Sequence, residues 1–121
     1  MDNIDRRKLR KLVKRQERNL ASHIGGRPTP SSGSGAVKGD AQTRKNRINE
    51  TLILAEAKLT TKKSISLKLE WLTKVLGYAQ QDGRYPLLEI EFVELSGKSH
   101  GKFYVAPEYL MNELLFGGRT Y

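Results

Sequence analysis

Hydrophobic residues recur at helical spacing near the start of the chain, in a stretch without Gly or Pro. This pattern predicts an amphipathic helix over residues 4–23, ended by a Gly pair, with its apolar face formed by Leu9, Leu12, Val13 and Leu20. Glu17 falls on that face, where an unpaired acid is costly, so we expect it to point inward. The alternative is a helix rotated so that Glu17 lies at its boundary. Residues 27–39 are rich in Pro, Ser and Gly, which predicts a loop.

The remaining pattern alternates between strands and helices. It predicts a strand pair joined by a polar turn, a helix capped by Ser66 and stopped by Asp82 and Gly83, a second strand pair and a short helix opened by Pro107. The four strands are expected at 36–43, 51–60, 86–95 and 102–105, and the two helices at 66–81 and 107–115. A loose tail is expected over 117–121. This order predicts an α/β fold, a mixed central sheet of four to five strands flanked by helices, in a single domain.

Composition excludes several kinds of site and favours a partner. The chain has 121 residues, no Cys and two His. The lack of Cys excludes a Cys nucleophile, a zinc ribbon and an iron–sulfur cluster, and two His nearly exclude a His-rich metal site. Its formal charge is +9, and all of the excess lies in residues 1–63. Clustered Lys and Arg favour a nucleic-acid partner over a basic solvated surface. We find no apolar run of membrane-spanning length and expect a soluble, intracellular, cytoplasmic protein without a membrane partner.

The second predicted strand carries the candidate chemistry. Its alternation puts Leu52, Leu54, Glu56 and Lys58 on one face, while the other face is also apolar, so neither side is expected to face open water. Two interpretations remain: a structural Glu and Lys pair, or a functional site. The antiparallel hairpin would bring Asp40 near Glu56, and two carboxylates beside a Lys are suited to Mg²⁺ or Mn²⁺. Glu17 would add a third carboxylate.

These residues carry a family resemblance. Asp40 followed by Glu56-Ala57-Lys58, the sole E-x-K of the chain, resembles the D…E-x-K signature of the PD-(D/E)xK nuclease superfamily. Residues 16–107 further resemble the archaeal-type Holliday junction resolvases and their bacteriophage relatives. The matching features are Glu17, the Ser32-Gly33-Ser34 loop, Gly39-Asp40, Glu56-x-Lys58 with Thr60, the following helix and Pro86. Gly39 stands where the superfamily has Pro, and the basic helical extension over residues 1–15 has no counterpart.

The resemblance implies a restriction-endonuclease-like fold and a Mg²⁺-dependent (or Mn²⁺-dependent) endonuclease of DNA recombination and repair. It would resolve four-way junctions by paired hydrolysis, which requires a homodimer. The implied metal ligands are Asp40, Glu56, Glu17 and the Ala57 carbonyl, and the implied catalytic residues are Glu17, Asp40, Glu56, Lys58 and Ser34. The expected DNA contacts are Arg15, Arg18, Ser32, Ser34, Lys38, Arg44, Lys45, Lys62 and Lys63. The alternatives are a nuclease of other DNA structures and a non-catalytic basic nucleic-acid-binding module.

Overall fold

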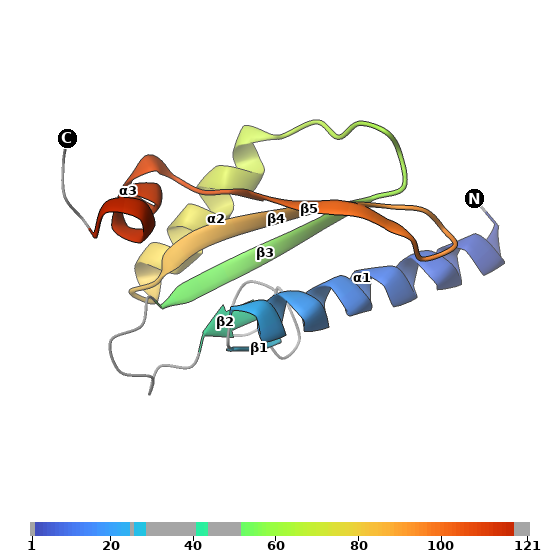
Figure 1. Ribbon diagram of the computed structural model, residues 1–121, viewed down its shortest axis with the longest axis horizontal. Helices are drawn as coiled ribbons and strands as arrows, with labels where there is room; N and C mark the ends of the chain where they lie inside the picture. The colour runs from blue at the N-terminus through green and yellow to red at the C-terminus, as the bar shows by residue number, and fades with distance from the viewer. Residues whose placement is uncertain (1, 25, 29–40, 44–51, 118–121) are drawn as a thin grey trace.

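The computed structural model describes residues 2–24, 26–28, 41–43 and 52–117 (Figure 1). In chain order the elements are α1 (Asn3–His23), β1 (Gly26–Pro28), β2 (Ala41–Thr43), β3 (Ile53–Thr60), α2 (Leu69–Gln81), β4 (Tyr85–Val93), β5 (Ser99–Val105) and α3 (Glu108–Phe116). Within these described ranges no helix is both long enough and apolar enough to span a bilayer.

Three long strands form the main part of the sheet. β3 pairs parallel with β4, from Ile53 opposite Tyr85 to Thr60 opposite Phe92, and β5 returns antiparallel along the other side of β4. The three-residue strands β1 and β2 continue the sheet beyond β3, each pairing antiparallel with its neighbour. The predicted α/β class, with a mixed sheet flanked by helices, is confirmed.

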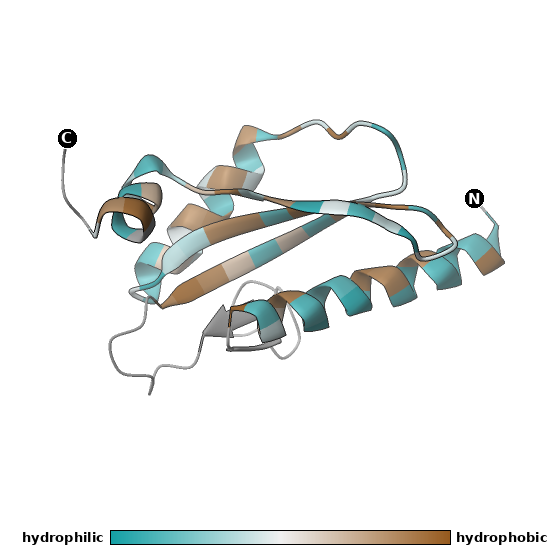
Figure 2. Ribbon diagram, viewed as in Figure 1, coloured by the Kyte–Doolittle hydropathy of each residue, from teal (hydrophilic) through white to brown (hydrophobic). Residues whose placement is uncertain are grey.

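The sheet has a helix on each face (Figure 1). On one face, Leu20 and Ala21 of α1 pack against Ala55 of β3 and Leu87 of β4. On the other face, α2 packs against Leu54 of β3. Because successive side chains of a strand point to opposite faces, β3 is covered on both sides, as the sequence predicted. Figure 2 shows the corresponding bands of hydrophobic residues on β3 and on the otherwise hydrophilic α1.

The buried stripe of α1 differs from the prediction by one residue. Leu12, Gln16 and Leu20, spaced by four, are the buried positions, and the Gln16 side chain is only 1% exposed. Glu17 is half-buried at the margin of this stripe, so its predicted place on the inner face is wrong. The Gln16 amide Nε2 donates to the Lys58 carbonyl at 3.0 Å, a bond that anchors the middle of α1 to β3.

Two predicted boundaries also change. The second helix begins at Leu69 rather than Ser66, because its first turn closes between the Trp71 amide and the Lys68 carbonyl at 3.1 Å. Lys68 therefore occupies the N-cap, and no side chain caps this end. The predicted loop after α1 is wrong at its start, since Arg27 and Pro28 pair with β2. The predicted stop at Asp82 and Gly83 is confirmed.

The turn from α2 into β4 depends on a buried guanidinium. The Arg84 Nε donates to the Asp82 carboxylate at 2.6 Å, and its Nη1 donates to the Ile53 carbonyl at 3.1 Å. Since Arg84 is almost fully buried, removing its guanidinium breaks both bonds where solvent has little access to replace them. We expect Arg84→Met to lower the free energy of unfolding by about 2–3 kcal/mol in urea denaturation. Lys98→Met, at an exposed turn, is the control and should change it by less than about 0.5 kcal/mol.

Candidate functional site

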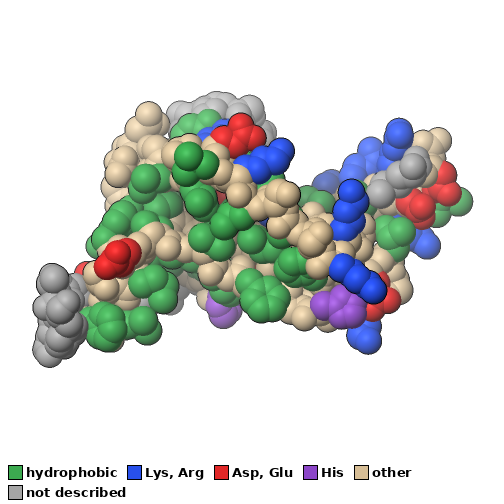
Figure 3. Space-filling view, turned by 90° about the horizontal axis from the view of Figure 1, so that it is seen from above, with side chains coloured by type: hydrophobic (Ala, Val, Ile, Leu, Met, Phe, Trp, Pro, Cys, Tyr) green, Lys and Arg blue, Asp and Glu red, His purple; other side chains and the backbone are tan. Residues whose placement is uncertain are grey.

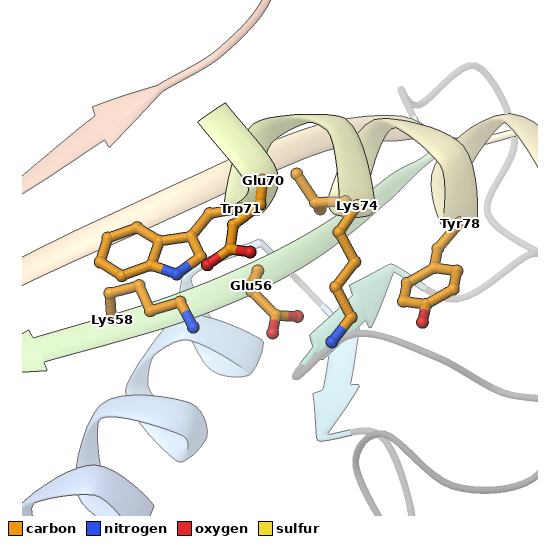
Figure 4. Close-up of a pocket in the computed structure, with 7 residues that line it drawn as sticks. Glu56, Lys58, Glu70, Trp71, Lys74 and Tyr78 are labelled. Carbon is orange, nitrogen blue, oxygen red and sulfur yellow. The ribbon is translucent and has the colours of Figure 1, made fainter. Parts of the chain in front are cut away.

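The even-numbered face of β3 opens into a pocket beneath α2. Glu56 and Lys58 line it from the strand, and the helix contributes Glu70, Trp71, Lys74, Val75 and Tyr78. We call this hollow of about 230 Å³ the Glu56 pocket. In Figure 4 the charged ends of the Glu56, Lys58 and Lys74 side chains face the same opening. The period of two that predicted Glu56 and Lys58 on one face is therefore observed, and both reach a concave site.

An aromatic ring holds the Lys58 side chain. The Lys58 Nζ lies 4.7 Å from the centre of the Trp71 ring, within the range in which an ammonium is attracted to an aromatic face. The Lys68 Nζ lies 5.8 Å from the same ring. Both Lys58 and Trp71 are half-buried, so the ammonium is positioned within the pocket rather than extended into bulk water. A fixed ammonium beside a carboxylate can orient a water molecule or offset negative charge on a phosphate.

Sequence analysis missed the contribution of α2 to this pocket. Glu70 and Lys74 are one helical turn apart, so they share a side of the helix, and Tyr78 follows after one more turn. That spacing of charged residues was the available signal. The helix is predicted from its leucines instead. These lie along a neighbouring side of α2 and line a separate apolar hollow with Pro86.

Several predicted site residues lie outside the described part of the chain. They are Ser32, Ser34, Lys38, Asp40, Arg44 and Lys45. Near them in sequence, the described strand β2 places Ala41 opposite Ala55 and Gln42 opposite Leu54. Because β2 and β3 are antiparallel, the N-terminal end of β2 is the end that lies nearer to Glu56.

The other predicted residues lie at three places. Glu17 is carried by α1, on the face of the sheet opposite the Glu56 pocket. The Arg15 Nη2 donates to the Gly97 carbonyl at 2.8 Å, which joins α1 to the turn between β4 and β5. Arg18 is exposed on α1, and exposed Lys62 and Lys63 follow the end of β3. The structure thus groups Glu56 and Lys58 and places Ala57 between them on the other face, and of the expected DNA contacts that it describes none lines the Glu56 pocket.

The described residues do not complete a metal site by themselves. Two carboxylates, Glu56 and Glu70, reach the Glu56 pocket. In the described part of the chain no group of three or more His, Cys, Asp or Glu side chains could hold a metal ion. Two carboxylates with hard oxygen donors match the sparse ligation of Mg²⁺, and a third acidic ligand would have to come from Asp40, beyond the described residues.

Two further carboxylates are buried on the α1 face. Glu89 and Glu91 of β4 are almost completely covered, and the Tyr104 hydroxyl donates to the Glu89 Oε2 at 2.7 Å. The Tyr104 ring stacks on His23 of α1, with ring centres 5.9 Å apart. Burial of the hydroxyl, and secondly its bond to Glu89, raise the pKa of Tyr104 above its usual value.

This raised pKa predicts how stability depends on alkaline pH. Tyr104→Phe removes the donor to a buried carboxylate, so it should lower the free energy of unfolding by about 1–3 kcal/mol at pH 7. Below about pH 10 tyrosine is neutral in both states, and this contribution is fully present. Above that pH the unfolded tyrosine ionises first, so the difference between wild type and variant should shrink. Urea denaturation at pH 7, 9 and 10.5 measures it, and a difference that stays constant would contradict the assignment.

Positive charge is concentrated on the exposed side of α1. Its exposed basic residues are Arg6, Arg7, Lys8, Arg10, Lys11, Lys14 and Arg18. Figure 3 shows the N-terminal part of this helix projecting from the body of the molecule with Lys and Arg side chains along it. Residues 3–15 are therefore part of the helix that joins the core, and they present a row of positive charge suited to a phosphate backbone.

Comparison with known proteins adds no relative. No protein-family model matches this chain, and neither the curated proteins nor the solved structures include a match to it.

Proposed function

We propose that this protein is a metal-dependent DNA endonuclease of the PD-(D/E)xK type that cuts branched DNA, with four-way junctions as its substrate. The observation that carries this proposal is the position of Glu56 and Lys58. Both side chains leave the same face of β3 and line one pocket, where Trp71 contacts the Lys58 ammonium. An acid and an ammonium held together in a concave site support hydrolysis of a phosphodiester, because the acid can hold a metal ion and the ammonium can offset charge on the phosphate.

The order of elements supports the same proposal. The chain runs from a helix through three successive antiparallel strands, then through α2 to a strand parallel to β3. The resemblance implies a restriction-endonuclease-like fold with four to five strands, and this finer assignment is part of the proposal. We further propose that Asp40 lies close to Glu56, because Asp40 directly precedes β2 and the N-terminal end of β2 is the end nearer to Glu56.

The chemistry would be divided among a few residues. Asp40, Glu56 and the Ala57 carbonyl would hold Mg²⁺ or Mn²⁺, which supplies Lewis acidity and offsets negative charge on the phosphate. Glu17, which the resemblance also implies as a ligand, lies on the opposite face of the sheet and is not part of this set. Lys58 would orient the attacking water and neutralise charge that develops on the scissile phosphate. Ser34 and Ser32 would contact that phosphate or its neighbour. Lys74 faces the same opening and would add a second cation at its rim.

The remaining contacts would place the DNA. The basic side of α1, together with Lys38, Arg44, Lys45, Lys62 and Lys63, would follow the phosphate backbone, which gives affinity without sequence preference. Paired cuts at a four-way junction need two pockets related by twofold symmetry, so the active form would be a homodimer. Tyr109 and Phe116 of α3 are exposed aromatic residues available for such an interface.

Cleavage of defined DNA substrates tests the proposal. Purified protein with Mg²⁺ is incubated with a four-way junction, a flap, a linear duplex and a single strand of matched sequence. We expect paired cuts near the branch point of the junction and none in EDTA. An intact junction in Mg²⁺ and in Mn²⁺ would refute the nuclease, whereas equal cutting of linear duplex would refute the preference for branched DNA.

One observation favours a second candidate, a non-catalytic nucleic-acid-binding module. Acids and amines alternate in the Glu56 pocket, with Glu56 and Glu70 facing Lys58 and Lys74, so their charges can balance without any ligand. This candidate predicts salt-sensitive DNA binding that is independent of divalent ions. Calorimetric titration with Mn²⁺ separates the two, since only the nuclease should bind the ion through Glu56.

A further inference from the structure

A second hollow continues the face of the sheet that carries Glu56 and Lys58. It has a volume of about 670 Å³, within the range of roughly 300–1,000 Å³ typical of ligand sites. Its lining comes from the residues that follow β3, from the end of β4 and the residue after it, and from β5: Thr61, Lys62, Lys63, Phe92, Val93, Glu94, His100 and Phe103. We call it the Phe103 hollow.

The strand register relates this hollow to the Glu56 pocket. Lys58 lies opposite Ile90, and Ile90 lies opposite Phe103. Side chains directly opposite one another in paired strands leave the same face of the sheet, so Lys58 and Phe103 belong to one row across three strands. Neighbouring strands are about 4.8 Å apart, which separates the two backbones by roughly 10 Å. Phe103 is therefore one or two nucleotides away from a phosphate held at Lys58.

The Phe103 ring is exposed and yet held in position. It is 57% exposed, and Phe92 supports it edge-on with ring centres 6.1 Å apart. Gly101 gives the ring room on the strand, because a Cβ added there would lie 3.3 Å from the Phe103 Cε2. The Gly101 backbone also has a φ of +134°, a conformation that side-chain-bearing residues rarely adopt. An exposed ring with a fixed orientation loses little freedom when another flat group stacks on it.

The charges around this ring match a phosphate. Lys62 and Lys63 are exposed, and among the described residues neither ammonium has an ion-pair partner. The one acid of the hollow, Glu94, is engaged with the His100 Nε2 at 2.9 Å. Two available cations beside an exposed aromatic face are the combination that binds a nucleotide outside a duplex, where the base stacks and the lysines contact phosphates.

We propose that the Phe103 hollow binds an unpaired nucleotide of the DNA substrate, with its base stacked on Phe103 and its backbone phosphates at Lys62 and Lys63. Nucleotide binding in this hollow rests on the proposed function only in one respect, namely that the bound nucleotide lies beside a cleavage site. Bases in a continuous duplex have no free face to offer, whereas branch points and strand ends do. The hollow thereby selects DNA with unpaired bases next to the cut.

Binding without cleavage tests this inference. Fluorescence anisotropy in EDTA is used to compare a labelled short oligothymidine with a blunt duplex at one salt concentration. Phe103→Ala should weaken oligothymidine binding roughly 5- to 100-fold, the effect of losing one stacked base, and change duplex binding less than about twofold. Phe103→Trp should restore the affinity. Unchanged oligothymidine binding, or an equal loss for both DNAs, would overturn the proposal.

A matched substitution and the two lysines complete the design. Leu115→Ala removes an exposed apolar side chain from α3, outside this hollow, and should leave both affinities unchanged. Replacing Lys62 and Lys63 together with Gln should reduce the salt dependence of oligothymidine binding by about 1.4 in log–log slope. The outcomes separate the two proposals. If the protein cuts no DNA but Phe103→Ala weakens oligothymidine binding, the nuclease is refuted and the nucleotide site is supported. If the protein cuts DNA but Phe103→Ala leaves oligothymidine binding unchanged, the nuclease is supported and the nucleotide site is refuted.

Discussion

Glu56→Gln is expected to reduce Mg²⁺-dependent cleavage of a four-way junction by at least about 10³-fold while DNA affinity in EDTA changes less than about threefold. Glutamine keeps the size and shape of the side chain but removes the charge that would hold the ion. Glu56 is half-buried at the edge of the pocket, so this exchange should not unfold the protein. Single-turnover cleavage, anisotropy and Mn²⁺ calorimetry measure the three effects.

The same pocket supplies a comparison. Glu70→Gln removes the other carboxylate, which α2 contributes from an exposed position, and should retain cleavage within about tenfold. Glu108→Gln on exposed α3 controls for the loss of one negative charge. If Glu56→Gln cuts as well as wild type, the catalytic proposal is wrong and the pair of charges is structural. If both pocket variants lose all cleavage, Glu70 is a ligand that the sequence interpretation omitted.

The local part of this site could be predicted because it depends on one strand. Alternation fixes the relative orientation of Glu56 and Lys58 wherever that strand lies, and the apolar residues on its other face indicated cover on both sides. The contribution of α2 could not be predicted in the same way. It depends on where the helix starts and how it is rotated about its axis, and a start at residue 69 instead of 66 changes which residues meet the strand.

The buried acids of β4 show a second limit. Glu89 and Glu91 alternate with apolar neighbours, a pattern typical of a strand with one solvent-exposed face. That face is covered instead, and Glu89 is 0% exposed, because α1 packs across it. The position of Gln16 follows from the same contact. Periodicity along one element carries no information about which other element covers it. The burial of these residues therefore could not be predicted from the sequence pattern.

Leucines of β4 and α2 differ in how deeply they are buried. Replacing the buried one gives the largest expected effect on stability. Leu88 of β4 is 0% exposed, whereas Leu69 is 73% exposed at the start of α2. Leu69 is exposed because the helix begins at this residue, before the buried positions Val75 and Ala79 that pack on the sheet.

We expect Leu88→Ala to lower the free energy of unfolding by about 3–4 kcal/mol, and Leu69→Ala to lower it by less than about 0.5 kcal/mol. Urea denaturation followed by the fluorescence of Trp71, the single Trp, measures both. A loss of 3–4 kcal/mol is a large part of the roughly 5–15 kcal/mol that stabilises a domain. Leu88 also lies opposite Glu56 in the parallel pair, so β4 supports the strand that carries the site. Equal effects of the two substitutions would show that Leu88 is not at the centre of the core, and the packing that positions Glu56 would have to be reassigned.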